Sequence, residues 1–199
     1  MSLKSITVGL LALQGDFAAH LKIFEGLGAQ TRLVRTPRDL EDIDGIAIPG
    51  GESTVMSRLS ERYGLFDPLR TRILEGLPAF GTCAGLIFLA KHIEGASQTF
   101  QQTTLGVLDC SVARNAYGAQ RESFQTQVEL AAVDAFVPAT FIRAPRITAI
   151  AENIEVLASW EGSPVVVRQE KIVACAFHPE IEGETRLHQL WLDVVGQNS

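Results

Sequence analysis

The chain has 199 residues, which is enough for one sizeable hydrophobic core, and we expect a single domain over residues 1–199. Hydrophobic residues make up 46% of it and charged residues 20%, a composition that is ordinary for a globular protein and argues against long disordered stretches. The formal net charge of −6 gives no electrostatic reason to expect a nucleic acid or an anionic membrane as partner.

Apolar stretches alternate with amphipathic ones in the first half of the chain. Residues 5–13 form a continuous apolar run that suits a buried parallel strand and is too short to span a bilayer. Asp16 can cap a helix whose apolar residues recur every three or four positions until Gly28. Further strands are expected at residues 31–34, 45–48 and 78–82, and helices at 53–63, around 69–74 and at 84–92. This order predicts an α/β fold, in which right-handed crossovers build a mostly parallel sheet with helices on both faces.

The second half is richer in predicted strands, which are expected at residues 105–113, 123–130, 140–143, 164–168 and 171–177. Only Gln169 and Glu170 separate the last two, which predicts a hairpin, although this turn lacks the glycine or asparagine that such turns prefer. Apolar residues at helical spacing between Leu187 and Val195 predict a final helix that packs against the core.

Three cysteines are spread widely along the chain, at Cys83, Cys110 and Cys175. Their odd number and wide spacing do not resemble a disulfide framework or a zinc site, so we expect no metal and a reducing, cytoplasmic setting. Cys110 and Cys175 each fall in an apolar strand candidate, which predicts that they pack in the core.

Cys83 stands in a different context, because Gly81 and Gly85 flank it at the junction of a predicted strand and a predicted helix. This pattern is typical of a nucleophile elbow, in which a sharp turn lifts the nucleophile out of the sheet. The helix N-terminus favours a thiolate, and the backbone N–H of Ala84 is free to donate to an oxyanion. Taken alone, the motif fits a buried structural cysteine about equally well.

A thiolate nucleophile needs a base, and His178 is the candidate among the four histidines. It follows a predicted strand and so lies at the carboxyl end, where open α/β sheets build their sites. Pro179 stiffens the next turn, and the Glu180 carboxylate can accept from one imidazole nitrogen while the other faces the sulfur. On its own this segment is more simply a solvated loop, and the cysteine elbow makes a catalytic triad the better interpretation. The remaining histidines all fall in predicted helices: His20, His92 and His188.

A glycine pair, Gly50 and Gly51, also follows a predicted strand and therefore reaches the same edge of the sheet. Without side chains, these residues let backbone N–H groups approach a ligand closely and could supply a second oxyanion donor. Most such pairs only turn the chain, so the motif is weak evidence by itself. The sequence contains neither a phosphate-binding loop nor a dinucleotide-binding fingerprint.

Two motifs together, Gly81-Thr82-Cys83-Ala84-Gly85 and His178-Pro179-Glu180, resemble those of class I, triad-type glutamine amidotransferases. Within that class the chain is most similar to the glutaminase subunits of pyridoxal 5'-phosphate synthase. Ile87 stands where many other members of the class carry glutamine, which disfavours the glutaminase of imidazole glycerol phosphate synthase. The supporting segments follow the family's order over nearly the whole chain, at residues 12–15, 49–54, 114–118, 141–145 and 177–180.

The resemblance implies a flavodoxin-like fold and the hydrolysis of L-glutamine to L-glutamate and ammonia. It implies that Cys83 attacks the side-chain amide, that His178 transfers protons and that Glu180 orients His178. By the same resemblance Gly51 and Ala84 form the oxyanion hole. The residues that match the family's glutamine-binding positions are Gly50, Gly51, Glu52, Arg114, Ile142 and Arg143. Arginine suits this task because its guanidinium binds a carboxylate through two parallel hydrogen bonds.

The resemblance also implies a partner, a barrel-shaped synthase subunit that takes the ammonia for vitamin B6 biosynthesis within a large hetero-oligomer. Gln14 is expected near that interface, and no metal or organic cofactor is implied for this chain. Two alternatives remain open: a thiol peptidase or hydrolase of related fold, and a non-catalytic regulatory module that keeps the fold.

Overall fold

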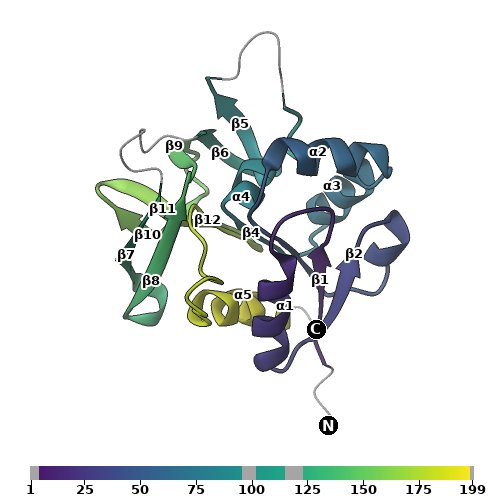
Figure 1. The fold of residues 1–199 in the computed structure, drawn as a ribbon, viewed down its shortest axis with the longest axis horizontal. Coiled ribbons are helices and arrows are strands. Elements are labelled where there is room, and N and C mark those ends of the chain that lie inside the picture. The colour runs from purple at the N-terminus through teal and green to yellow at the C-terminus, as the bar shows by residue number, and fades with distance from the viewer. Residues whose placement is uncertain (1–4, 96–101, 115–122, 198–199) are drawn as a thin grey trace.

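A computed structural model describes residues 5–95, 102–114 and 123–197 of the chain (Figure 1). Strands and helices alternate through the first half, and strands dominate the second. The elements are β1 (Thr7–Leu11), α1 (Phe17–Gly26), β2 (Gln30–Val34), the 3-10 helix η1 (Pro37–Leu40), β3 (Gly45–Ile48), α2 (Ser53–Arg62), α3 (Phe66–Leu74), β4 (Ala79–Thr82), α4 (Ala84–Leu89), β5 (Ala90–Glu94), β6 (Leu108–Ala113), β7 (Ser123–Leu130), the 3-10 helix η3 (Ala131–Val133), β8 (Ala135–Ile142), β9 (Arg146–Ile150), β10 (Glu155–Trp160), β11 (Ser163–Gln169), β12 (Ile172–Cys175) and α5 (Arg186–Gly196).

The centre of the fold is a seven-stranded sheet in the order β10-β11-β12-β4-β3-β1-β2. The strands from β12 to β2 run parallel, whereas β10 and β11 are antiparallel to their neighbours. Every residue of β3, β4 and β12 is buried, which explains why these segments are largely apolar in the sequence. The prediction of a mostly parallel sheet is confirmed.

Helices cover both faces of this sheet, with α1 and α5 on one face and α2, α3 and α4 on the other (Figure 1). Successive side chains of a strand point to opposite faces. On β4, Phe80 packs against Phe24 of α1 and Trp191 of α5. A Cβ on the next residue, Gly81, would instead meet Leu89 of α4. The strand that leads to Cys83 is therefore held between the two helical layers.

Two smaller sheets carry the rest of the second half. Strands β5, β6 and β9 form one of them, and the antiparallel pair β7 and β8 forms the other. Strand β8 passes beside the segment that follows β12, because the backbone N–H of His178 donates to the carbonyl of Thr140 at 2.8 Å. Within the ranges that the structure describes, no helix is long and apolar enough to cross a membrane.

Some of the sequence predictions were wrong in detail. Residues 84–92 do not form one helix, because α4 ends at Leu89 and β5 begins at Ala90. Strand β5 pairs with β6, and this pairing overrides the local helical pattern, so His92 lies on an exposed strand. Strands β9 and β10 were not predicted, because their largely exposed side chains give little hydrophobic signal. The β11–β12 hairpin is confirmed, with Glu170 at φ 52° in its turn.

Candidate active site

Cys83 occupies the sharp turn between β4 and α4. Its backbone has φ 49° and ψ −101°, a conformation that L-residues rarely adopt. The turn is crowded by neighbouring segments, since a Cβ on Gly85 would overlap the backbone carbonyl of Ile48 in β3. The glycines around Cys83 are therefore required by close packing, and the geometry is that of a nucleophile elbow.

His178 and Glu180 lie beside this turn because β12 is the parallel neighbour of β4. Cys175 in β12 pairs with Thr82, the residue before Cys83, so both segments leave the sheet at the same edge. The Nδ1 atom of His178 lies 2.7 Å from Oε1 of Glu180, whose side chain is only 1% exposed. The structure thus brings together the three residues expected to form the triad.

The charges of this group follow from its hydrogen bonds. Burial alone lowers the pKa of His178, but hydrogen bonds to Cys83 and Glu180 outweigh it and raise this pKa to about 10. Burial is the largest single influence on the pKa of Glu180 and raises it, but the hydrogen bond with His178 and the interactions with the neighbouring imidazoles together outweigh burial, so the pKa of the carboxyl is lowered. At neutral pH an imidazolium therefore lies between a carboxylate and the sulfur, the arrangement that a thiolate nucleophile needs.

The glycine pair follows β3, the other parallel neighbour of β4. Gly50 lies against the His178 ring, where a Cβ would overlap the Cε1 atom. Gly51 has φ 146° and lies against the side chain of Gln14, whose Oε1 accepts the backbone N–H of Glu52 at 2.9 Å. Gln14 thus fixes the conformation of the loop that was expected to donate to an oxyanion.

The second expected donor is the backbone N–H of Ala84. Because Ala84 begins α4, this N–H has no acceptor within the helix. Ala84 and Gly51 line the same cavity as Cys83, so both backbones border the space in which an oxyanion would form.

A cavity of about 220 Å³ opens beside Cys83. It is smaller than the roughly 300–1,000 Å³ typical of sites for drug-sized ligands and suits a single amino acid. Gly50 and Glu180 are not part of its lining, although both contact His178. Its lining comprises Gly51, Glu52, Ser53, Cys83, Ala84, Ile87, Arg114, Ile142, Arg143 and His178.

Opposite charges lie together at the rim of the cavity. Nη2 of Arg114 lies 3.1 Å from Oε1 of Glu52, and both side chains are partly exposed. Arg143 is exposed and has φ 42°, so two non-glycine residues of the lining, Cys83 and Arg143, adopt positive φ angles. The carbonyl oxygen of Ile142 lies 4.0 Å from Sγ of Cys83. A free amino acid offers a carboxylate and an ammonium group, which match this pair of charges.

The structure also adds residues that the sequence patterns did not indicate. Ser53 lines the cavity, and His20 and His188 lie behind Glu180. A buried histidine on an amphipathic helix gives no pattern that separates it from a surface one, so no signal was available. The expected core positions of Cys110 and Cys175 are confirmed, and burial raises the pKa of Cys110 to about 12. Of the supporting segment at residues 114–118, positions 115–118 lie outside the described residues.

Known proteins are similar to this chain in both sequence and fold. The sequence pattern of the SNO glutamine amidotransferase family matches residues 10–197. The pyridoxal 5'-phosphate synthase subunit PdxT of Corynebacterium glutamicum is 50% identical over 196 residues, covering 96% of this chain and 97% of that protein. A crystal structure of a glutamine amidotransferase superimposes with a TM-score of 0.89 at 44% identity, covering 95% of this chain and 98% of that one. The structure of PurLQS from Thermotoga maritima has a TM-score of 0.69 at 14% identity, over 95% of this chain and 98% of that one, and shows a common fold alone.

Proposed function

Because this chain belongs to the SNO glutamine amidotransferase family, we propose that it hydrolyses L-glutamine through a thioester on Cys83 and delivers the ammonia to a pyridoxal 5'-phosphate synthase subunit. The chain is a glutamine amidotransferase, so the peptidase and the non-catalytic alternatives are set aside. The observation that carries the catalytic assignment is the position of His178 between Glu180 and the cavity that Cys83 lines.

The reaction begins when the Cys83 thiolate attacks the side-chain carbonyl carbon of glutamine. A C–S bond forms, and the carbonyl π electrons move to oxygen, where the N–H groups of Gly51 and Ala84 stabilise the negative charge. His178 then gives its proton to the amide nitrogen, the C–N bond breaks and ammonia leaves a thioester behind. Glu180 holds the imidazole ring in the orientation that this transfer needs.

Water completes the cycle. His178, now neutral, takes one proton from water while the hydroxyl oxygen attacks the thioester carbon. The C–S bond breaks, the thiolate and the imidazolium are regenerated, and glutamic acid loses its remaining proton to solvent. The net reaction converts glutamine and water to glutamate and ammonia.

Substrate glutamine is proposed to bind between the charges at the rim of the cavity. The Arg114 guanidinium would hold the α-carboxylate, with Arg143 nearby, and the Glu52 carboxylate would hold the α-ammonium group. The Ile142 backbone borders the scissile amide, since its carbonyl oxygen lies 4.0 Å from Sγ of Cys83. Gly50 contributes by leaving space for His178.

The partner is proposed from the relatives, whose names describe them as synthase subunits. We expect a large hetero-oligomer with a barrel-shaped synthase, in the cytoplasm, where the three free cysteines would stay reduced. Gln14 contacts Gly51, so a partner that binds near Gln14 would alter the oxyanion hole and the rate of hydrolysis. We expect the same partner to raise the affinity for glutamine, and by linkage glutamine would then tighten the complex by the same factor.

The test is the rate of glutamate release from glutamine, with and without a pyridoxal 5'-phosphate synthase subunit. We expect the partner to stimulate the wild type and the Cys110→Ala control, and the Cys83→Ala variant to be inactive in both settings. Activity that survives in Cys83→Ala would exclude the thioester. Equal rates with and without the synthase would exclude the proposed coupling to that partner, even if Cys83 proved essential.

A further inference from the structure

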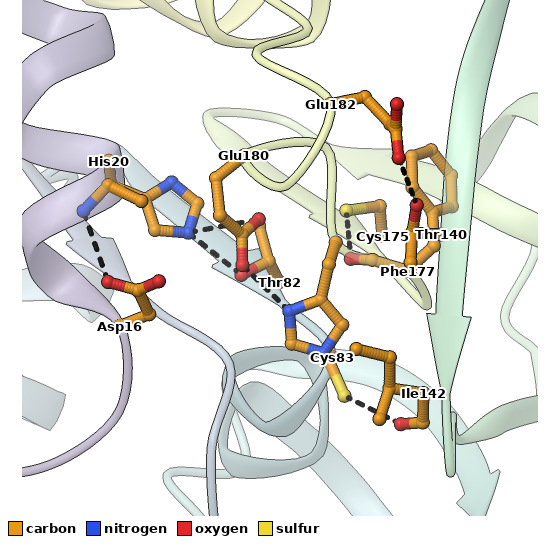
Figure 2. Close-up of polar contacts among 12 residues, drawn as sticks. Asp16, His20, Thr82, Cys83, Thr140, Ile142, Cys175, Phe177, Glu180 and Glu182 are labelled. Atoms are coloured by element: carbon orange, nitrogen blue, oxygen red, sulfur yellow. Dashed lines mark hydrogen bonds and ion pairs between the residues drawn. The ribbon is translucent and has the colours of Figure 1, made fainter. Parts of the chain in front are cut away.

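A line of buried histidines extends behind Glu180, on the side away from the cavity. His20 of α1 is 1% exposed and His188 of α5 is fully buried. Nδ1 of His20 lies 2.8 Å from Nε2 of His188. Nε2 of His20 lies 3.2 Å from Oγ1 of Thr82 and 3.4 Å from Oε2 of Glu180, and Figure 2 shows these three side chains converging. Helices α1 and α5, which cover one face of the sheet, are thereby connected to Thr82, the residue before Cys83.

The partners of His188 fix where its proton lies. Its Nδ1 atom lies 3.0 Å from the backbone carbonyl oxygen of Glu184, and a carbonyl can only accept, so His188 carries its proton on Nδ1. Burial lowers the pKa of His188 to about 3, which keeps the ring neutral and its Nε2 an acceptor. His20 must therefore donate to it from Nδ1.

The interaction of His20 with Glu180 therefore depends on whether Nε2 of His20 carries a proton. Burial lowers the pKa of His20, which favours a neutral ring whose Nε2 accepts the Thr82 hydroxyl. The titratable groups that face His20 are Glu180, with His178 beyond it, His188, and Asp16 at the start of α1. A lone pair of His20 then faces Oε2 of Glu180, an oxygen with no hydrogen-bond partner in the described part of the chain.

We propose that His188 and His20 are positioning residues for glutamine hydrolysis, which keep Nε2 of His20 unprotonated so that Glu180 directs its charge to the ring of His178. This inference rests on the proposed function, because it assumes that His178 transfers protons for Cys83. If Nε2 of His20 carried a proton, it would donate a hydrogen bond to Oε2 of Glu180. That hydrogen bond would offset part of the negative charge of the carboxylate. His178 would then be a weaker base, because its carboxylate partner would be partly neutralised.

Two substitutions of His188 separate this role from packing. In His188→Gln, the side-chain oxygen of the new residue reaches the position of Nε2 and can still accept a hydrogen bond from the Nδ1–H of His20. His188→Leu has no acceptor, and His20 is then free to carry its single proton on Nε2 and donate it to Glu180. With the synthase subunit present, we expect His188→Leu to lower kcat for glutamate release about tenfold, the effect of one hydrogen bond to a charged group, and to leave KM within about twofold. We expect His188→Gln to keep kcat within about threefold of the wild type.

A second readout does not depend on turnover. NMR of protein labelled at the histidine Cε1 carbons would follow the titration of His178, which we expect to move down by about one pH unit in His188→Leu and to stay unchanged in His188→Gln. Leu187→Ala is the control, because this buried residue on α5 lies outside the histidine line and should lower thermal stability alone. The proposal would be overturned if His188→Leu left both kcat and the titration of His178 unchanged. It would also be overturned if Leu187→Ala lowered kcat and shifted the titration as much as His188→Leu does. Glutamate release by Cys83→Ala would instead overturn the proposed function.

Discussion

Gly50 and His178 are in such close contact that a Cβ on Gly50 would overlap the imidazole ring. The two residues follow different strands of the sheet, β3 and β12, which are separated only by β4. Besides the backbone donors that we propose for it, the glycine loop therefore forms a wall against the His178 ring.

The first prediction follows from this contact. Gly50→Ala should displace the His178 ring and lower kcat/KM by about a hundredfold or more, because a shift of about 1 Å in a catalytic group costs that much. The control is Gly26→Ala, in α1, where a Cβ meets nothing within 4 Å, and which should leave activity unchanged and stabilise the fold by up to about 1 kcal/mol. Steady-state kinetics and urea unfolding of both variants would check this. Full activity in Gly50→Ala would contradict the proposed wall.

The second prediction concerns the carboxylate. Glu180→Gln keeps the shape of the side chain but removes the charge that holds the imidazolium, so kcat should fall by about 10²- to 10⁴-fold. Glu182→Gln is a matched control two residues further on, because Glu182 accepts from Thr140 at 3.3 Å instead. Glutamate release measured with the synthase subunit would decide this, and similar losses in the two variants would argue against a triad.

The third prediction is that acid destabilises the protein from about pH 6.5 downward. The pKa of His188 is about 3 in the fold and about 6.5 in an unfolded chain, so between these values the unfolded state binds more protons. Stability is therefore lost as the pH falls through this window, by up to about 1.4 kcal/mol per pH unit for this residue. Urea unfolding between pH 7 and pH 5 should give a shallower slope for His188→Gln than for the wild type. Equal slopes would show that His188 is not kept neutral by burial.

The fourth prediction concerns substrate recognition. Arg114→Ala should raise KM for glutamine about tenfold or more and change kcat less, because the lost hydrogen bonds to the α-carboxylate form in the ground state as well as in the transition state. Arg32→Ala is the control, since Arg32 pairs with Asp42 at 3.5 Å on the exposed surface. If kcat fell while KM stayed constant, Arg114 would have a role in the chemical step rather than in binding.

The local sequence indicated much of the candidate site. Strands that are buried on both faces have largely apolar sequences. The glycines around Cys83 indicate a turn in which there is no space for a Cβ. Because each chemical motif directly follows such a strand, the meeting of the Cys83 elbow with His178 could be expected from topology alone. The role of Gln14 at a partner interface stays a prediction, whereas its contact with Gly51 is visible only in the fold.

Other features depended on contacts between distant residues. Residues 90–94 form a strand rather than a helical turn because β6 is available to pair with them. His20 and His188 are separated by 168 positions, and no local pattern distinguishes them from surface histidines. Strand burial and turn sterics act over a few neighbouring residues, so the local sequence was sufficient to indicate the candidate catalytic residues. The surroundings of Glu180 became visible only in the fold, because they form where α1, α5 and β4 pack together.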